Sequence, residues 1–436
     1  MNYQEALNWI HAKIKLGPKP GLKRMEWLLN AFDNPQRHLP AVHVVGTNGK
    51  GSTVAYLQHI FRQSAYRVGT FTSPFIIDFR ERIAIDGQMI SKADLISLVE
   101  LVQPVVDSLP EQTDFAPASE FEVVCLMMFL YFTRINSVDI AIIEAGIGGL
   151  NDATNMFHAL AVVCPSIGLD HQEMLGKTHA EIAYQKASVL KGGEAFIFAS
   201  QNQSVTQVFH EICQQKNSRA FHLGTDFTIL ESHASFDFCY KEQVLKNITL
   251  KMLGSHQRQN ASLAIMVSLI LQKAYPKVTL ENIRTAIAQT SWVGRTEFLM
   301  PQLMLDGAHN NESIDALVKL IQDDYTDKKM HILFAAIKSK PLDSMLDKLS
   351  SLGSVFVTTF SFPKALQLDD YPQGYDRIDD YHSFLQEARH SSCDNLYLVT
   401  GSLYFISQVR QDFIKMNRVE DEKATVFCTR FIKCFY

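Results

Sequence analysis

A glycine-rich segment near the start of the chain limits its fold more than any other feature. Three β-branched residues, Val42, Val44 and Val45, precede Gly46-Thr-Asn-Gly-Lys-Gly-Ser-Thr53, and an apolar, helix-like run follows at 54–61. A strand that passes through a glycine turn into a helix directs several backbone N–H groups, and the positive end of the helix dipole, at one anion. The segment therefore predicts a phosphate-binding loop.

The spacing of this loop differs from the common G-x-x-x-x-G-K-[ST] pattern. Val44 stands at the first glycine position, and Gly51 separates Lys50 from Ser52. A glycine turn without a ligand is the alternative, but the strand-to-helix context favours nucleotide binding. We expect Lys50 to neutralise the terminal phosphates, and Ser52 or Thr53 to supply a hydroxyl to phosphate or metal. The predicted nucleotide-binding residues of the loop are Gly46, Thr47, Asn48, Gly49, Lys50, Gly51, Ser52 and Thr53.

Composition excludes several classes of protein. The 436 residues exceed what one hydrophobic core usually serves, so two domains are expected. A formal net charge of −5 gives no basic excess for nucleic acid or anionic lipid. The seven cysteines form no C-x-x-C pair, which indicates a reducing compartment. The longest apolar run, at 123–132, has about ten residues, half of a membrane span, and predicts a buried helix. We expect a cytoplasmic monomer without a secretory leader, a nucleic-acid partner or a membrane partner.

Strand-like runs alternate with helix-like runs through the first half of the chain. The predicted buried strands are 42–45, 68–71, 138–144 and 159–165. This alternation is typical of β-α-β units and predicts an α/β fold with a mostly parallel sheet covered by helices on both faces. A shorter alternating pattern at 227–250 predicts a small antiparallel patch attached to the same domain.

The alternation starts again after residue 296. The predicted strands are 303–306, 331–335, 355–359 and 396–400, and the predicted helices between the first three are 312–323 and 342–349. We expect an ATP-binding domain over 1–296, of the P-loop ATPase type, and a smaller doubly wound α/β domain over 300–415. No role is assigned to residues 416–436, whose apolar end, 428–436, is read either as a docking strand or as an appended or frameshifted end.

Polar residues lie where the predicted parallel strands end, which is where such sheets place their active sites. Ser73 follows the second strand, in a loop rich in charged side chains, and Glu144 ends the third. A lone carboxylate at the end of an apolar strand is costly to bury. Because Mg²⁺ favours one or two carboxylates together with phosphate oxygens, it is the partner that we expect for Glu144.

Two further groups lie near the ends of these elements. Asp170 and His171 follow the fourth predicted strand and are expected to bind a metal or transfer protons, although an isolated histidine is more often a buried structural residue. Lys186 lies in the helix-like stretch 182–190, and we expect it to face the same cleft.

Taken together, these segments resemble the folylpolyglutamate synthase/dihydrofolate synthase family, within the wider group of Mur-type ligases. The resemblance extends to about residue 415. Its motifs, in the family's order, are Gly46-Thr-Asn-Gly-Lys-Gly-Ser52, Thr72-Ser-Pro-Phe75, Glu81-Arg-Ile83, Gly148-Gly149 with Asp152-Ala-Thr-Asn155, Leu169-Asp-His171, Gly254-Ser-His-Gln257 with Asn260-Ala261, Gly294-Arg295 and Leu305-Asp-Gly-Ala-His-Asn310. The resemblance implies an ATP-dependent ligase that joins L-glutamate to the carboxylate of a folate, such as tetrahydrofolate, through an acyl phosphate.

The resemblance also implies roles for single residues and ions. Lys50, His171 and Lys186 are the expected catalytic residues. Ser73 and Glu144 are expected to hold one Mg²⁺, and Glu144 with His171 a second. Lys186 matches a lysine that is carbamylated in relatives and then binds metal. Further ATP contacts are expected from Asn260, Arg295, Asp306 and His309. K⁺ is left open as an additional cofactor.

The motif at residues 148–155, near the residues expected to bind folate, differs from the family pattern at position 150. The expected folate-binding residues are Phe75, Arg82, Phe121, Glu122 and Asp152. Of these, Phe121 is expected to stack on the pterin ring. Relatives with added dihydrofolate synthase activity often carry Gly-Gly-Arg-Leu-Asp-Ala-Thr-Asn, whereas here Leu150 stands at the arginine position. Whether dihydropteroate is a second acceptor is therefore left open.

Two other functions account for part of the pattern. A Mur-type ligase of cell-wall precursors usually recognises a uridine nucleotide through a further N-terminal domain, and we expect none because the phosphate loop starts at Gly46. A nucleotide-binding regulator without enzymatic activity would need neither a second metal site nor Lys186. ATP turnover with added tetrahydrofolate and glutamate separates a ligase from a regulator.

Overall fold

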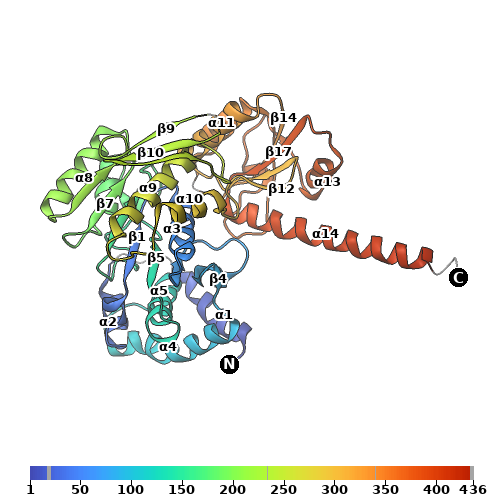
Figure 1. The fold of residues 1–436 in the computed structure, drawn as a ribbon. Coiled ribbons are helices and arrows are strands. Elements are labelled where there is room, and N and C mark those ends of the chain that lie inside the picture. The colour runs from blue at the N-terminus through green and yellow to red at the C-terminus, as the bar shows by residue number, and fades with distance from the viewer. Residues whose placement is uncertain (17–20, 233, 339, 433–436) are drawn as a thin grey trace. The chain divides into compact units, whose positions relative to one another are not determined.

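The computed structural model describes residues 1–16, 21–232, 234–338 and 340–432 (Figure 1). The chain divides into two compact units, of which the first comprises Met1–Lys251 and Ser255–Ser291. The second comprises the short segment Met252–Gly254 and the part of the chain from Trp292 onward. The division thus falls a few residues before the boundary that the sequence placed at 296–300.

An eight-stranded sheet forms the centre of the first unit, in the order β4-β3-β2-β5-β1-β6-β7-β8. Its strands are β1 (Ala41–Val44), β2 (Val68–Phe71), β3 (Ile83–Ile85), β4 (Gln88–Met89), β5 (Ile140–Glu144), β6 (Ala161–Cys164), β7 (Ala195–Phe198) and β8 (Arg219–His222). The pairs from β2 to β8 are parallel, whereas β3 and β4 add an antiparallel edge. The predicted mostly parallel sheet is confirmed.

Helices cover this sheet. They are α1 (Tyr3–His11), α2 (Lys23–Asn30), α3 (Lys50–Gln63), α4 (Lys92–Gln112), α5 (Glu120–Leu130), α6 (Gln172–Leu175), α7 (His179–Ala187), α8 (Gln203–Gln215), α9 (Ser255–Leu271) and α10 (Leu280–Gln289), with the short turns η1 (Ala12–Leu16), η2 (Pro35–His38), η3 (Phe79–Arg82) and η4 (Tyr131–Ile135). Ala141 and Ile143, which alternate with Ile142 along β5, pack in one core with α5. Figure 1 shows α3, α9 and α10 on the side of these strands opposite α4 and α5.

The remaining strands of the first unit form the antiparallel sheet β11-β10-β9, with β9 at Thr228–Glu231, β10 at Phe236–Tyr240 and β11 at Gln243–Ile248. The antiparallel patch predicted at 227–250 is therefore confirmed. The apolar run at 123–132 lies within α5 and the start of η4, and its side chains are buried, as predicted. Among the described residues, no helix has both the length and the apolar character needed to cross a membrane.

The second unit is a smaller doubly wound domain, as expected. Its strands are β12 (Glu297–Met300), β13 (Leu303–Leu305), β14 (Lys329–Phe334), β15 (Gly353–Val357), β16 (Asp376–Arg377) and β17 (Asn395–Thr400), in the order β12-β13-β17-β14-β15-β16. All pairs except β12 with β13 are parallel. Its helices are α11 (Asn311–Asp324), α12 (Leu342–Ser350), α13 (His382–His390) and α14 (Leu403–Ile432), with the turn η5 at Leu368–Asp370.

Alternate residues of the central strands show how the helices divide between the two faces. Met304 of β13 packs in one core with α11 and α12, whereas Leu303 and Leu305 pack in a second core with α13 and α14. Helix α14 continues to Ile432, so residues 428–432 are helical and the alternative of a docking strand is wrong for them. Residues 433–436 lie outside the described part of the chain.

Candidate active site

The phosphate loop connects the end of β1 to the start of α3. Gly49 precedes Lys50, the first helical residue, with a positive φ of 85° that favours glycine. Its backbone is also closely packed, because a Cβ there would lie 2.5 Å from Asn260 Oδ1 and 2.9 Å from Pro165 Cβ. Asn260 of α9, an expected ATP contact, is thus brought against the turn of the loop.

The loop is held by the segment that follows β6. Thr47 N–H donates to Ser166 O at 2.9 Å, and Asn48 N–H donates to Ser166 Oγ at 2.9 Å. Gly168 N–H donates to Thr47 Oγ1 at 2.9 Å. These bonds hold the loop against the segment that follows β6.

Two side chains of α9 reach the loop. Gln257 Nε2 donates to Ser52 Oγ at 3.2 Å, and Asn260 Nδ2 donates to Gln257 Oε1 at 3.2 Å. All three residues are buried. Gln257 belongs to one of the sequence motifs, but its contact with Ser52 could not be predicted, because the two residues are 205 positions apart in the sequence. Its position under the loop makes it a support for the Ser52 hydroxyl.

The ends of three neighbouring strands bring Lys50, Glu144 and Ser73 together. Lys50 Nζ lies 3.9 Å from Glu144 Oε1, and Ser73 N–H donates to Glu144 Oε2 at 3.3 Å. The Glu144 side chain is only 6% exposed. A carboxylate, a hydroxyl-bearing residue and the phosphate-loop lysine thus meet at one edge of the sheet, where the sequence predicted a site.

Lys186 lies beneath the same loop. Its side chain is buried, and Nζ donates to Gly46 O at 2.9 Å. Burial, reinforced by the positive charge of Lys50, lowers the pKa of Lys186 to about 7. A large share of its amine is therefore neutral and nucleophilic near neutral pH.

His171 has a left-handed backbone conformation, with φ 52° and ψ 39°, and immediately precedes the short helix α6. Such a conformation is uncommon for a residue other than glycine and is often found at functional sites. Within the described residues, His, Cys, Asp and Glu side chains do not form a group of three or more suited to a metal ion. The second metal site, with Glu144, His171 and a carbamylated Lys186, therefore stays a prediction.

The expected folate-binding residues Arg82 and Phe121 lie close together. The Arg82 guanidinium carbon lies 5.5 Å from the centre of the Phe121 ring, and its Nη1 donates to Glu120 Oε1 at 2.8 Å. The Arg82 Nε is buried without a hydrogen-bond partner. Phe75 packs on Phe79 with ring centres 5.8 Å apart. The first unit thus offers aromatic surface and an unsatisfied donor beside the edge that carries Glu144.

Two other expected folate ligands, Glu122 and Asp152, are engaged with the protein itself. Glu122 Oε2 accepts from the N–H and hydroxyl of Ser119 at 2.8 Å each, and its Oε1 accepts from Arg24 Nε at 2.9 Å. Asp152 Oδ2 accepts from Ile147 N–H at 2.8 Å. Direct contact of these two carboxylates with folate stays a prediction, and their present partners give them a structural role.

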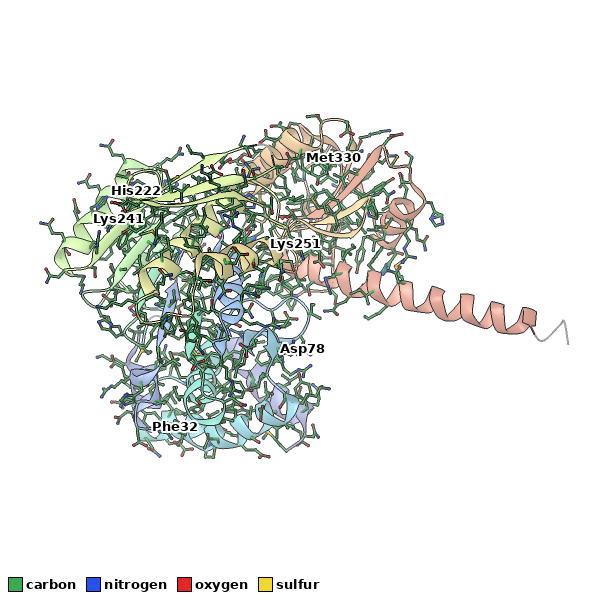
Figure 2. All side chains as sticks on the ribbon, in the orientation of Figure 1. Phe32, Asp78, His222, Lys241, Lys251 and Met330 are labelled. Carbon is green, nitrogen blue, oxygen red and sulfur yellow. The ribbon has the colours of Figure 1, made fainter. Side chains whose placement is uncertain are left out.

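Two charged side chains of the loop 72–83 are bound to the loop itself. Asp78, which Figure 2 labels, caps η3 by accepting from Arg80 N–H at 2.9 Å. Glu81 Oε1 and Oε2 accept from the N–H groups of Ile76, Ile77 and Asp78. The carboxylates of Asp78 and Glu81 therefore shape the loop.

In the second unit, the expected ATP contacts gather where β13 ends. Asp306 Oδ2 accepts from Thr296 N–H at 2.9 Å, which holds the segment that carries Arg295. Gly307 N–H donates to Gly294 O at 2.9 Å, and His309 Nδ1 lies 2.8 Å from Gly307 O. Arg295, Asp306 and His309 thus form one cluster at the carboxyl end of this strand.

Comparisons with known proteins agree with this geometry. Residues 44–268 match the family model described as the Mur ligase middle domain. The chain is 35% identical to a dihydrofolate synthase/folylpolyglutamate synthase of Bacillus subtilis, over 94% of this chain and 98% of that protein. It is 30% identical to a folylpolyglutamate synthase of Lacticaseibacillus casei, over 95% and 99% of the two chains.

Solved structures agree in fold. A structure described as an FPGS–AMPPCP–folate complex, where FPGS denotes folylpolyglutamate synthase, matches with a TM-score of 0.82 and 29% identity over 94% of this chain and 99% of that one. The glycine-rich loop between β1 and α3 and the Lys50–Glu144 pair give the sequence match a structural basis. The chain belongs to the folylpolyglutamate synthase/dihydrofolate synthase family of Mur-type ligases.

Proposed function

We propose that this protein is an ATP-dependent ligase that adds L-glutamate to the carboxylate of a folate. One observation carries the proposal: Lys50 of the phosphate loop, Glu144 and Ser73 meet at the carboxyl edge of the sheet, beside Arg82 and the aromatic residues around it. The residues proposed to bind phosphate and those proposed to bind a flat aromatic acceptor therefore belong to the same unit.

The reaction needs two steps. A carboxylate oxygen of the folate attacks the γ-phosphorus of ATP, and the bond from this phosphorus to the bridging β-phosphate oxygen breaks. The products are ADP and an acyl phosphate of the folate. The amino nitrogen of glutamate then attacks the acyl carbon and loses a proton, and the C–O bond to phosphate breaks to leave an amide. The first step brings a carboxylate toward a triphosphate, so Lys50 and the loop N–H groups must offset that repulsion.

The donor set at Glu144 suits Mg²⁺. One carboxylate, the neighbouring Ser73 hydroxyl and phosphate oxygens are ligands that this ion accepts without a larger protein cage. When bound there, Mg²⁺ would neutralise charge on the transferring phosphate. Glu144 and His171, with Lys186 if it is carbamylated, are proposed for a second ion, and K⁺ is retained from the resemblance alone. Ser73 and Glu144 then have the task of orienting the ion relative to Lys50.

The proposed ATP contacts are the loop residues 46–53 with Asn260, and Arg295, Asp306 and His309 from the second unit. The packing of Asn260 against Gly49 supports its assignment. The bonds of Asp306 to Thr296 and Ala308 support a rigid position for its carboxylate. We also propose that residues 1–296 form the ATP-binding domain and that residues 300–415 form the smaller domain of the ligase. The protein is further proposed to be a cytoplasmic monomer.

ATP turnover tests the function directly. ADP release is measured with tetrahydrofolate and glutamate added separately and together, and the glutamylated folate is identified by mass spectrometry. Release that requires both substrates, with one amide formed per ADP, supports the proposal. Hydrolysis that neither substrate changes would favour the regulator instead, and turnover with a uridine-linked acceptor would favour a cell-wall ligase.

Carbamylation of Lys186 is expected to increase as the pH rises through about 7. The sign follows from the pKa: burial lowers it to about 7, so below this value the amine is protonated and does not react with CO₂, whereas above it the neutral amine does. An ordinary lysine would stay protonated to about pH 10. The measurement is ¹³C NMR after equilibration with ¹³C-bicarbonate between pH 6 and 9, with Lys186→Met as the control. A carbamate signal that persists in this variant, or a Lys186→Ala enzyme with full activity, would rule out the role.

Turnover with dihydropteroate as sole acceptor is expected to be at least about tenfold lower than with tetrahydrofolate, because Leu150 cannot donate the charge-assisted hydrogen bond of an arginine. Leu150→Arg is expected to narrow the difference. Comparison of kcat/KM for the two acceptors in both proteins makes the measurement. Equal values in the wild type would mean that Leu150 does not limit the second activity.

A further inference from the structure

A buried polar chain joins β1 to the loop between β5 and β6. His43 Nε2 lies 2.9 Å from Thr154 Oγ1, and Thr154 Oγ1 donates to Asp152 Oδ1 at 2.5 Å. His43 is 2% exposed and Thr154 is fully buried. The Thr154 hydroxyl donates its hydrogen bond to the Asp152 carboxylate, so the Thr154 oxygen must accept a hydrogen bond from His43. The His43 imidazole therefore carries its proton on Nε2.

Nothing in the proposed reaction uses His43. Burial lowers the pKa of His43 to about 3, so the ring is neutral and acts as a fixed hydrogen-bond donor. It also packs on Phe157, with ring centres 5.0 Å apart. A neutral, enclosed histidine that donates to a threonine next to a buried carboxylate is suited to holding a position.

Asp152 transmits this position to the backbone before it in sequence. Its Oδ2 accepts from Ile147 N–H at 2.8 Å. Its Oδ1 accepts from Thr154 N–H at 3.0 Å. The carboxylate therefore ties the backbone at Ile147, the residue after Gly146, to the 152–154 turn.

Gly146 is in direct contact with the Phe121 ring. A Cβ at Gly146 would lie 2.6 Å from Phe121 Cζ, so only a glycine backbone allows the ring to lie where it does. The same ring lies 5.5 Å from the Arg82 guanidinium carbon and 5.8 Å from the Phe71 ring centre. A shift of the 146–147 backbone would therefore move the aromatic wall that is expected to receive the folate.

We propose that His43 and Thr154 are positioning residues for folate binding, which act through Asp152 and the 146–147 backbone on Phe121. This inference rests on the function proposed above. It gives Asp152 an indirect role, through the loop, in place of direct contact with the ligand. Since this chain of hydrogen bonds leads to Phe121, in the expected folate site, breaking it is expected to weaken folate binding much more than ATP binding.

Thr154→Val tests the proposal, because it removes the hydroxyl at nearly constant volume and breaks both hydrogen bonds. We expect the KM and the Kd for tetrahydrofolate to rise about tenfold, the effect of one lost charge-assisted bond, with the KM for ATP within about twofold of wild type. Thr154→Ser, which keeps the hydroxyl, is expected to restore the folate affinity. Binding is measured by equilibrium dialysis without glutamate, so that it does not depend on turnover.

Thr290→Val is the matched control. Its hydroxyl is also fully buried and donates to Ala286 O at 2.8 Å, at the end of α10. We expect this variant to melt at a lower temperature with unchanged folate affinity, which is the result that a merely structural hydroxyl gives. An unchanged folate Kd in Thr154→Val, or an equal rise in the KM values for folate and ATP, would overturn the proposal.

His43 variants provide a second test if Thr154→Val does not fold. In His43→Gln the amide nitrogen takes the place of Nε2, so folate affinity near that of wild type is expected, whereas His43→Leu is expected to weaken folate binding about tenfold. Wild-type affinity in His43→Leu would contradict the inference. A wild-type protein without glutamate-dependent turnover would instead contradict the proposed function, so the two failures are distinguishable.

Discussion

Replacing Lys50 with alanine is expected to lower glutamate-dependent ATP turnover by about a thousandfold, because removal of one preorganised donor from a transferring group has effects of this size. The Lys50 Nζ is 3.9 Å from Glu144 Oε1 and is held by Thr47 O at 3.2 Å, so it is preset at the edge where the phosphates bind. Without it, the charges of the triphosphate and the folate carboxylate repel each other with less compensation. ADP release with saturating tetrahydrofolate and glutamate gives the measurement.

Lys92→Ala is a matched control for this variant. Lys92 is the first residue of α4, as Lys50 is of α3, so both changes place alanine, a good helix former, at the same helical position. Circular dichroism and melting temperature are expected to stay near wild type in both proteins, and only Lys50→Ala is expected to lose turnover. Activity in Lys50→Ala within tenfold of wild type would show that the loop amides suffice without the lysine.

Local sequence rules were enough to find the centre of this site. A β-branched run followed by a glycine turn places Lys50 at a helix start, and an apolar run that ends in an acid places Glu144 at the end of a strand. Both inferences need only neighbours in the sequence, and parallel pairing then puts the strand ends at one edge. The antiparallel β3–β4 edge was not predicted, because strands of two or three residues leave too short a pattern.

Partners far apart in the sequence could not be predicted. The sequence marks Glu122 as an acid near an aromatic residue, but its ion pair with Arg24 spans 98 positions. Asp152 was assigned to folate by resemblance, yet its carboxylate holds Ile147 and Thr154. In both cases residue type and spacing show that a carboxylate is present, whereas only the packed structure shows which donors satisfy it.

Glu144→Ala is expected to lower turnover by about a thousandfold with little loss of stability, as is common when a polar group preset for catalysis is removed. The carboxylate is 6% exposed, its Lys50 partner is as distant as 3.9 Å, and its bond to Ser73 N–H is long, at 3.3 Å. The Glu144 carboxylate lies at the end of a strand beside the phosphate-loop lysine, which is the position proposed above for a Mg²⁺ ligand. Its removal is therefore expected to affect the reaction more than the fold.

Glu194→Ala is the control that separates a loss of turnover from a loss of stability. Glu194 is also a buried carboxylate, but it accepts from Lys191 N–H at 2.9 Å and Gly192 N–H at 2.6 Å, away from the phosphate loop. Removing it leaves buried donors unsatisfied, so the melting temperature is expected to fall while turnover per folded molecule is kept. Glu144→Ala is expected to show the opposite pattern, with a weakened dependence of ATP binding on Mg²⁺. If Glu144→Ala instead loses stability and keeps turnover, its carboxylate serves the fold and the metal assignment fails.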